Sequence, residues 1–142
     1  MKTSRKTDYA VHALMIMAKN KNEELSVKEL AEIENVSSSY LAKVMQQLSA
    51  SGIVSSTEGK KGGYTLSKSA GEINLAQIME LFEGENNVFE CVDDIHGCTI
   101  KDRCKIHRVF GQAYQKMLAE LEKTNIKDII NPEITLKKEL IR

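Results

Sequence analysis

The sequence predicts a mostly α-helical fold with a small β-hairpin wing, that is, a winged helix-turn-helix plus a long helix. Three observations predict it. Apolar residues recur at helical spacing along most of the chain, and one glycine-rich turn is flanked by β-forming residues. The 142 residues include a single proline, 42% apolar residues and 28% charged residues, which is typical of a helix-rich protein with a real core.

The first predicted helix lies in the N-terminal 20 residues, where an apolar stripe consists of Val11, Leu14, Met15 and Ala18. The segment is basic and then apolar, as an export signal is, but charged residues interrupt it and no small-residue cleavage site follows. No apolar run approaches the roughly 18–20 residues that cross a bilayer. We therefore expect an amphipathic helix in a cytoplasmic protein without a membrane partner.

The next two predicted helices form a helix-turn-helix pattern. Ser26 and Glu29 form a capping box at the start of the first, and Asn35 can adopt the left-handed conformation that ends it. Ser37 or Ser38 caps the second. A helical hairpin with another role has the same periodicity, so these residues alone leave both interpretations open.

A predicted hairpin follows directly. Residues 53–56 and 64–66 are β-forming, and they flank the turn Glu58-Gly59-Lys60-Lys61-Gly62-Gly63. Lys60 and Lys61 at its tip suit contact with DNA phosphates, and the glycines let the backbone come close. An ordinary solvated hairpin is the alternative, but the position after a helix-turn-helix favours a wing.

Charge is distributed unevenly, although the net charge is zero. Residues 1–70 carry ten Lys and Arg against seven Asp and Glu, and residues 71–142 carry ten against thirteen. A basic first half suits a protein with one DNA-facing end. We expect a winged helix-turn-helix DNA-binding domain over residues 1–72, and a second unit over residues 73–142.

The second unit begins with a predicted helix after Asn74 that ends at Gly84, followed by a polar loop over residues 85–101. A long helix then runs from about Asp102 to Lys123, and a short one follows through Ile130. The long helix has an apolar stripe of Ile106, Val109, Phe110, Ala113, Met117 and Leu121. A second copy is the natural cover for it, so we expect a homodimer built on this dimerisation helix; folding onto the first helix is the alternative.

Three cysteines lie within fourteen residues, with Cys91, Cys98 and Cys104 in a C-x6-C-x5-C spacing. An odd number excludes a complete disulfide framework in the monomer, and such clustering points to metal or redox chemistry. His107, one helical turn after Cys104, is the nearest further ligand. Thiolates at this wide spacing favour an iron–sulfur cluster. A zinc site, a metal-free thiol switch and buried structural thiols remain alternatives.

Together these residues resemble the Rrf family of bacterial winged-helix transcription regulators, which has IscR-like and NsrR-like members. The resemblance spans nearly the whole chain. It rests on Thr7-Asp8-Tyr9-Ala10 in the first helix, Ser39-Tyr40-Leu41 in the third, Gly59-Lys60-Lys61-Gly62-Gly63-Tyr64 in the wing, and the three cysteines.

The resemblance implies a homodimeric regulator, expected to be a repressor, that binds double-stranded operator DNA and carries a cluster on Cys91, Cys98 and Cys104. IscR-like members use a histidine shortly after the third cysteine, which corresponds to His107 and implies a 2Fe–2S cluster. NsrR-like members use an aspartate of the other subunit's first helix. This aspartate corresponds to Asp8 and implies a nitric-oxide-sensitive 4Fe–4S cluster. This chain has both residues.

Residues expected to contact DNA lie on the third helix, in the wing and at the N-terminus. Base-edge contacts are expected from Lys43, Gln46 and Gln47. Phosphate contacts are expected from Ser38, Ser39 and Tyr40, from Lys60 and Lys61, and from Lys2, Ser4 and Arg5. This chain departs from the family at two positions. Glu58 replaces a common arginine at the base of the wing, which should weaken a phosphate or minor-groove contact, and Ala42 replaces the glutamate of IscR-like members, so the operator sequence stays open.

An enzyme is the main rival from another functional class. The sequence has no phosphate-binding glycine loop, catalytic triad or C-x-x-C pair, so we do not expect catalysis. The alternative with the same architecture is a metal-free thiol-switch or metabolite-responsive regulator.

Overall fold

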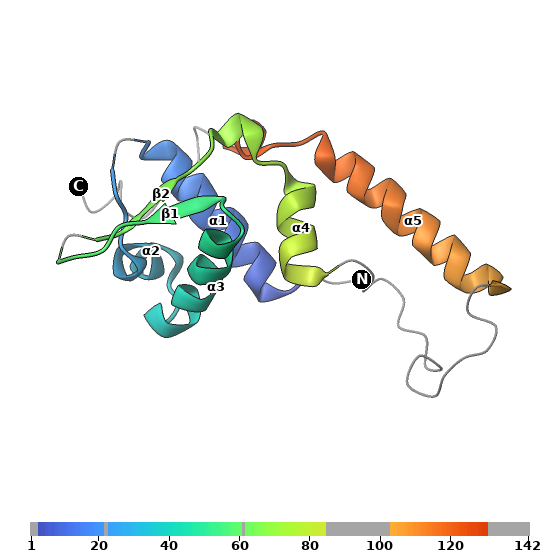
Figure 1. Cartoon of the computed structure of the whole chain (residues 1–142), viewed down its shortest axis with the longest axis horizontal. Helices are drawn as coiled ribbons and strands as arrows, with labels where there is room; N and C mark the ends of the chain where they lie inside the picture. The colour runs from blue at the N-terminus through green and yellow to red at the C-terminus, as the bar shows by residue number, and fades with distance from the viewer. Residues whose placement is uncertain (1–2, 22, 61, 85–102, 131–142) are drawn as a thin grey trace.

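The computed structural model describes residues 3–21, 23–60, 62–84 and 103–130. It is mostly helical with a two-stranded antiparallel sheet, as the sequence predicts (Figure 1). The helices are α1 (Arg5–Lys19), α2 (Val27–Glu34), α3 (Ser38–Ala50), α4 (Leu75–Glu83), α5 (Lys105–Glu122) and α6 (Ile126–Ile129), with a 3₁₀ turn η1 (Ala70–Glu72). The strands are β1 (Val54–Ser56) and β2 (Tyr64–Leu66).

The predicted capping residues define the helix-turn-helix. Ser26 N–H donates to Glu29 Oε2 at 2.9 Å and Ser26 Oγ accepts from Glu29 N–H at 3.2 Å, which completes the capping box of α2. Asn35 has φ 56° and ψ 50°, the left-handed conformation that ends α2. Ser37 rather than Ser38 caps α3, accepting from Tyr40 N–H at 3.3 Å. These local interactions fix the turn between the two helices.

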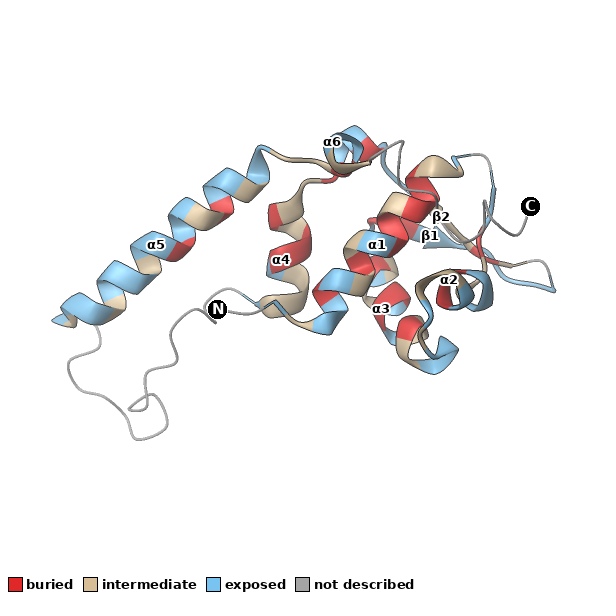
Figure 2. Cartoon of the chain, turned by 180° about the vertical axis from the view of Figure 1, so that it is seen from behind, coloured by how far each residue is buried: buried red, intermediate tan, exposed pale blue. Residues whose placement is uncertain are grey.

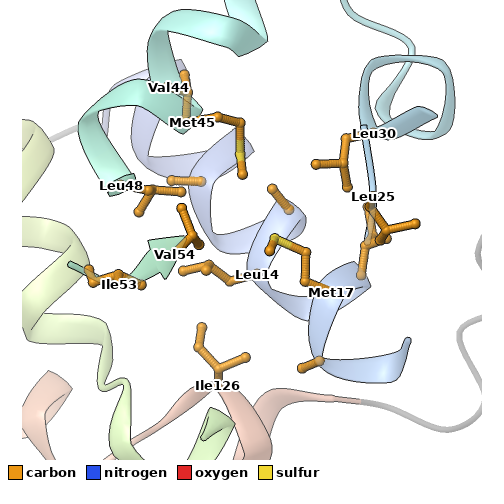
Figure 3. Close-up of a cluster of buried hydrophobic side chains, with 14 of the residues drawn as sticks. Leu14, Met17, Leu25, Leu30, Val44, Met45, Leu48, Ile53, Val54 and Ile126 are labelled. Carbon is orange, nitrogen blue, oxygen red and sulfur yellow. The ribbon is translucent and has the colours of Figure 1, made fainter. Parts of the chain in front are cut away.

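The main core surrounds α1, which contacts α2, α3, α4, α6 and β2. Figure 3 shows Leu14 and Met17 of α1 among side chains from the other elements. Fully or almost fully buried residues of this core include Leu14, Met17, Leu25, Leu30, Val44, Met45, Leu48, Ile53, Val54 and Ile126. These aliphatic side chains come from all the elements that surround α1, and their burial stabilises the packing of the helix-turn-helix and the wing against each other.

The wing is anchored at its base. In the sheet, Val54 pairs with Leu66 and Ser56 with Tyr64. Leu25, in the segment before α2, extends this ladder: its N–H donates to the Tyr64 carbonyl at 3.1 Å, and Tyr64 N–H donates to the Leu25 carbonyl at 2.8 Å. The hairpin is therefore hydrogen-bonded to the rest of the helix-turn-helix unit.

The two helices that follow the wing pack one after the other on the winged unit. α4 packs on α1, and α5 packs on α4 through a second cluster of Ala76, Met79, Tyr114 and Leu118. The chain then returns to the core, where α6 places the fully buried Ile126. In Figure 1, α4 lies between α5 and the winged unit. No helix in the described ranges is long and apolar enough to span a membrane.

The long helix differs from the expectation in two ways. It starts at Lys105 rather than near residue 102, and it packs on α4, which was neither the expected second copy nor the alternative, α1. Its two buried residues, Tyr114 and Leu118, lie outside the predicted apolar stripe, whereas Met117 and Leu121 of that stripe pack, partly buried, against the same cluster. Ile106, Val109 and Phe110 of that stripe are 57%, 58% and 39% exposed. Figure 2 shows the burial of α5 confined to a narrow face.

Gly63 gives a test of the wing anchor. A Cβ at this position would lie 2.8 Å from the Leu25 carbonyl oxygen and 2.9 Å from its carbon, neither of which can move without breaking the ladder. We expect Gly63→Ala to lower the free energy of unfolding by about 1–3 kcal/mol in urea denaturation, because backbone clashes force shifts of that cost. Gly71→Ala is the matched control, since its nearest contact is the Lys127 Cδ atom at 4.0 Å. Equal stabilities of the two variants would contradict the anchor.

Candidate DNA-binding and cofactor sites

The outer face of α3 is polar and accessible. Ser38, Ser39, Lys43 and Gln46 are exposed, and Gln47 is half-buried. Four apolar residues of the same helix point into the core, namely Leu41, Val44, Met45 and Leu48. One face of α3 is thus fixed by packing while the other presents hydroxyl, ammonium and amide groups, the groups that bind phosphates and base edges.

Tyr40 is held differently from its neighbours. Its side chain is half-buried, and its ring meets the ring of Tyr9 edge-to-face, with centroids 5.7 Å apart and an interplanar angle of 76°. Such pairs contribute to packing. Tyr40 therefore links α3 to α1 as well as lying near the start of the predicted DNA-binding face.

The wing tip presents Lys60, which is exposed, next to the exposed Glu58; Lys61 lies outside the described residues. Two backbone bonds close the tip: Thr57 N–H donates to the Gly63 carbonyl at 2.9 Å, and Gly62 N–H donates to the Gly59 carbonyl at 3.0 Å. Gly59 has φ +119°, a conformation that favours glycine. The tip thus holds a lysine at the end of a closed turn.

The N-terminal turn of α1 holds two of the predicted phosphate contacts. Arg5 is exposed, whereas Ser4 is half-buried and caps the helix, its Oγ accepting from Thr7 N–H at 3.4 Å. Lys2 lies outside the described residues. The Ser4 hydroxyl therefore has a structural role at the start of α1.

The structure describes one cysteine of the three. Cys104 is a half-buried free thiol, and Cys91 and Cys98 lie outside the described residues. The expectation that Cys104 and His107 share one helix needs correction, because Cys104 is the N-cap of α5, in extended backbone geometry. Its sulfur makes no capping hydrogen bond. His107 follows within the first turn of α5 and is half-buried. The Cys104 sulfur is therefore available as a ligand at a helix N-terminus, where negative charge is favoured.

Asp8 lies on the first turn of α1, and its side chain is 65% exposed. The His12 imidazole lies beside it, with Nε2 3.7 Å from Asp8 Oδ1. Figures 1 and 2 show α1 and the start of α5 on different sides of α4. The fold of one chain therefore separates Asp8 from the turn that Cys104 caps. Among the described residues, no three His, Cys, Asp or Glu side chains are gathered as a metal site.

Glu34, at the end of α2, is a residue that sequence reasoning missed. Both of its carboxylate oxygens are shielded from solvent, and no described residue forms a hydrogen bond with them. Burial, and secondly the charge of Asp8, raise the pKa of Glu34 to about 8. Its position was readable in principle: it follows the buried Leu30 by four residues and Ala31 by three, and so lies on the inner face of α2. A buried carboxyl thus lies close to Asp8.

Comparisons with known proteins agree with this arrangement. A family model described as Rrf2, iron-dependent transcriptional regulator, matches residues 3–132. The regulator NsrR of Bacillus subtilis is 31% identical over 140 residues, which cover 96% of each chain. NsrR of Bacillus licheniformis is 30% identical over 140 residues, covering 97% of this chain and 98% of the relative.

Solved structures show the same fold. CymR of Staphylococcus aureus in an oxidised form has a TM-score of 0.71 and 26% identity, covering 95% of this chain and 100% of that one. CymR of B. subtilis, a global cysteine regulator, has a TM-score of 0.71 at 24% identity and 92% and 96% coverage. IscR of T. potens has a TM-score of 0.68 at 24% identity and 92% and 86% coverage.

Glu34 predicts a dependence of stability on pH. The unfolded chain releases this proton near the ordinary value of 4.5, whereas the folded chain holds it to about pH 8. Stability is therefore lost through this group as the pH rises from about 4.5 to 8. Glu34→Gln removes that loss, so we expect the variant to exceed the wild type by about 1–3 kcal/mol at pH 8.5 and to match it much more closely at pH 4.5.

Urea denaturation of the metal-free protein at fixed concentration measures both values. Glu32→Gln, an exposed neighbour on α2, is the control and should leave the pH profile unchanged. A wild-type profile that Glu34→Gln does not alter would show that the folded chain does not protonate this carboxyl.

Proposed function

The chain belongs to the Rrf2 family of transcriptional regulators, and we propose that it is a homodimeric, operator-binding regulator controlled by an iron–sulfur cluster. Regulators of this family bind DNA and are typically dimeric. In this proposal residues 1–72 form the DNA-binding domain, and residues 73–142 carry the cluster and the dimerisation helix. The protein acts in the cytoplasm, where its operator lies, and is not an enzyme.

The outer face of α3 carries the DNA-binding proposal. Lys43 and Gln46 are exposed on a helix whose other face is buried, and their lengths suit them to base edges in the major groove, with Gln47 beside them. Phosphate contacts are assigned to Ser38, Ser39 and Tyr40, to Lys60 and Lys61 of the wing, and to Lys2, Ser4 and Arg5. Tyr40 and Ser4 combine this role with the packing and capping described above.

The apolar face of α5 supports the homodimer. Ile106, Val109 and Phe110 are exposed large hydrophobic residues on consecutive turns of one helix. Their burial by a second copy removes apolar surface from water on both protomers, because a twofold interface uses the same patch twice. The α4 side of α5 is already covered, so the second copy binds the neighbouring face that carries these exposed residues.

Cys91, Cys98 and Cys104 are assigned as thiolate ligands of the cluster. The free thiol of Cys104 fits this assignment, since its sulfur is not used in capping α5. We assign the fourth position to Asp8 of the partner protomer, supported by the NsrR relatives and by the exposure of the Asp8 carboxylate. His107 is the alternative ligand, and it would be contributed in cis.

When bound, the cluster supplies reactivity toward nitric oxide or oxidants and responds to iron–sulfur supply. In this proposal, gain or loss of the cluster changes how the two protomers are placed relative to each other. A carboxylate on α1 of one protomer would join the first turn of α5 of the other, and so fix the relative placement of the two α3 helices. A hundredfold change in operator affinity needs about 2.8 kcal/mol of such coupling.

Two observations favour the cluster-free alternative. One relative of known structure is CymR solved in an oxidised form, which suits a thiol switch on these cysteines. The structure also has an open cavity of about 500 Å³ whose lining includes Lys21, Lys68 and Lys127, a size that admits a small metabolite. A protein without iron after anaerobic purification would favour this alternative.

The proposal is tested by anaerobic purification followed by iron and sulfide counts and operator binding. The probe is a duplex that the wild-type protein selects from random-sequence DNA. We expect about four iron and four sulfide per protomer with Asp8 as ligand, or about two with His107, and at least a tenfold change in affinity when a chelator removes the cluster.

Cys98→Ala should abolish this response and leave the dimer folded by circular dichroism and sedimentation. A Cys98→Ala protein that still responds to the chelator as the wild type does would overturn the cluster-based control. Binding of the cluster-free wild type to the selected duplex reports separately on the DNA-binding assignment.

A further inference from the structure

The first turn of α1 is held by a residue that lies far along the sequence, at the end of α4. Glu83, the last residue of α4, accepts from Ser4 N–H at 2.6 Å and from the Thr7 hydroxyl at 2.5 Å, both at its Oε1 atom. These contacts span 79 and 76 positions in the sequence. A carboxylate at a helix N-terminus satisfies free N–H groups and interacts favourably with the helix dipole.

The charge on Glu83 is stabilised by these bonds. Burial by itself raises the pKa of Glu83, but the hydrogen bonds from Thr7 and Ser4 outweigh it and hold the pKa below its usual value. Ser4 Oγ also caps α1, at the longer distance of 3.4 Å from Thr7 N–H. Glu83 therefore adds a charged, long-range contact to a helix start that already has a local cap.

The next residue makes a second long-range contact. Gly84 ends α4 with φ +76°, and its carbonyl accepts from the Tyr114 hydroxyl at 2.9 Å. Tyr114 is 3% exposed and packs in the cluster between α4 and α5. A buried tyrosine hydroxyl needs such a partner. Two consecutive residues thus form hydrogen bonds to different helices: Glu83 to the start of α1, and Gly84 to α5.

We propose that Glu83 is a positioning residue, which ties the first turn of α1 to the junction of α4 and α5 at Gly84. The proposal rests on the assignment above, in which Arg5 and Asp8 of that turn contact DNA and the partner's cluster. A displacement of α5 reaches Gly84 through Tyr114, and reaches Arg5 and Asp8 through Glu83. Both contacts are direct hydrogen bonds, so the route is contiguous.

Hydrogen–deuterium exchange of the cluster-free protein tests this tie without depending on the cofactor. The variants are Glu83→Ala, Tyr114→Phe and the double variant, with Glu80→Ala, an exposed residue of α4, as the control. We expect Glu83→Ala to speed exchange of the Thr7 and Asp8 amides at least tenfold, and Glu80→Ala to leave it unchanged.

Tyr114→Phe removes one hydroxyl and keeps the ring, so the α4–α5 packing is retained. We expect it to speed exchange in the first turn of α1 in the wild-type background, and to add nothing in the Glu83→Ala background, because the route is already broken. Additive effects of the two changes, or no effect of Tyr114→Phe on α1, would overturn the proposal. If Glu83→Ala does not fold, Glu83→Met, which keeps the length of the side chain and removes both acceptor oxygens, takes its place.

Operator binding separates this proposal from the proposed function. If the loaded wild type responds to cluster removal, we expect Glu83→Ala to reduce the ratio of the two affinities at least fivefold with unchanged iron content. A full wild-type ratio in that variant would overturn the positioning role while leaving cluster control intact. A wild type without iron would remove the cluster assignment, and the exchange measurements would still decide the tie.

Discussion

The structure depends on the burial of α1. Helices α2, α3, α4 and α6 and strand β2 all contact this one helix, and Ala10, Ala13 and Ala18 on it are almost fully buried. Small side chains let neighbouring backbones approach closely, so several elements can share one central helix. Leu14 and Met17 then fill the space that remains (Figure 3). Displacing α1 would therefore disturb the helix-turn-helix, the wing and α4 together.

The first turn of the same helix exposes charged side chains. Arg5 and Asp8 are both exposed and lie within one turn of each other; in the proposed function Arg5 contacts DNA and Asp8 completes the partner's cofactor site. Glu34 lies close to Asp8; its buried carboxyl has no hydrogen-bond partner among the described residues, and burial, followed by the charge of Asp8, raises its pKa to about 8. An unsatisfied buried polar group is rare and costs stability. The first turn of α1 therefore carries residues of the proposed function, and the charge of one of them, Asp8, affects a buried group that costs stability.

Local signals in the sequence predicted the helix-turn-helix well. The capping box at Ser26, the left-handed Asn35 and the glycine-rich wing are short-range features, and the structure confirms each. The covered face of α5 was predicted only in part: Met117 and Leu121 of the expected stripe pack against α4, but apolar residues extend around the helix and only tertiary packing selects Tyr114 and Leu118 for burial. Glu83 was missed for a similar reason: its partners lie more than seventy positions away, and no periodicity reports such a contact. The cofactor residues stay a prediction, since Cys91 and Cys98 lie outside the described residues.

In the proposed function, α1 of one protomer completes the cofactor site of the other. Mixed dimers of an Asp8→Ala chain and a Cys98→Ala chain, purified anaerobically with two different affinity tags, test this arrangement. Each homodimer should lack the cluster, whereas the mixed dimer should regain one cluster per dimer, seen in its visible absorption and iron content. That site combines intact cysteines of one chain with the partner's intact Asp8. A fully loaded Asp8→Ala homodimer, or a mixed dimer without iron, would contradict the account.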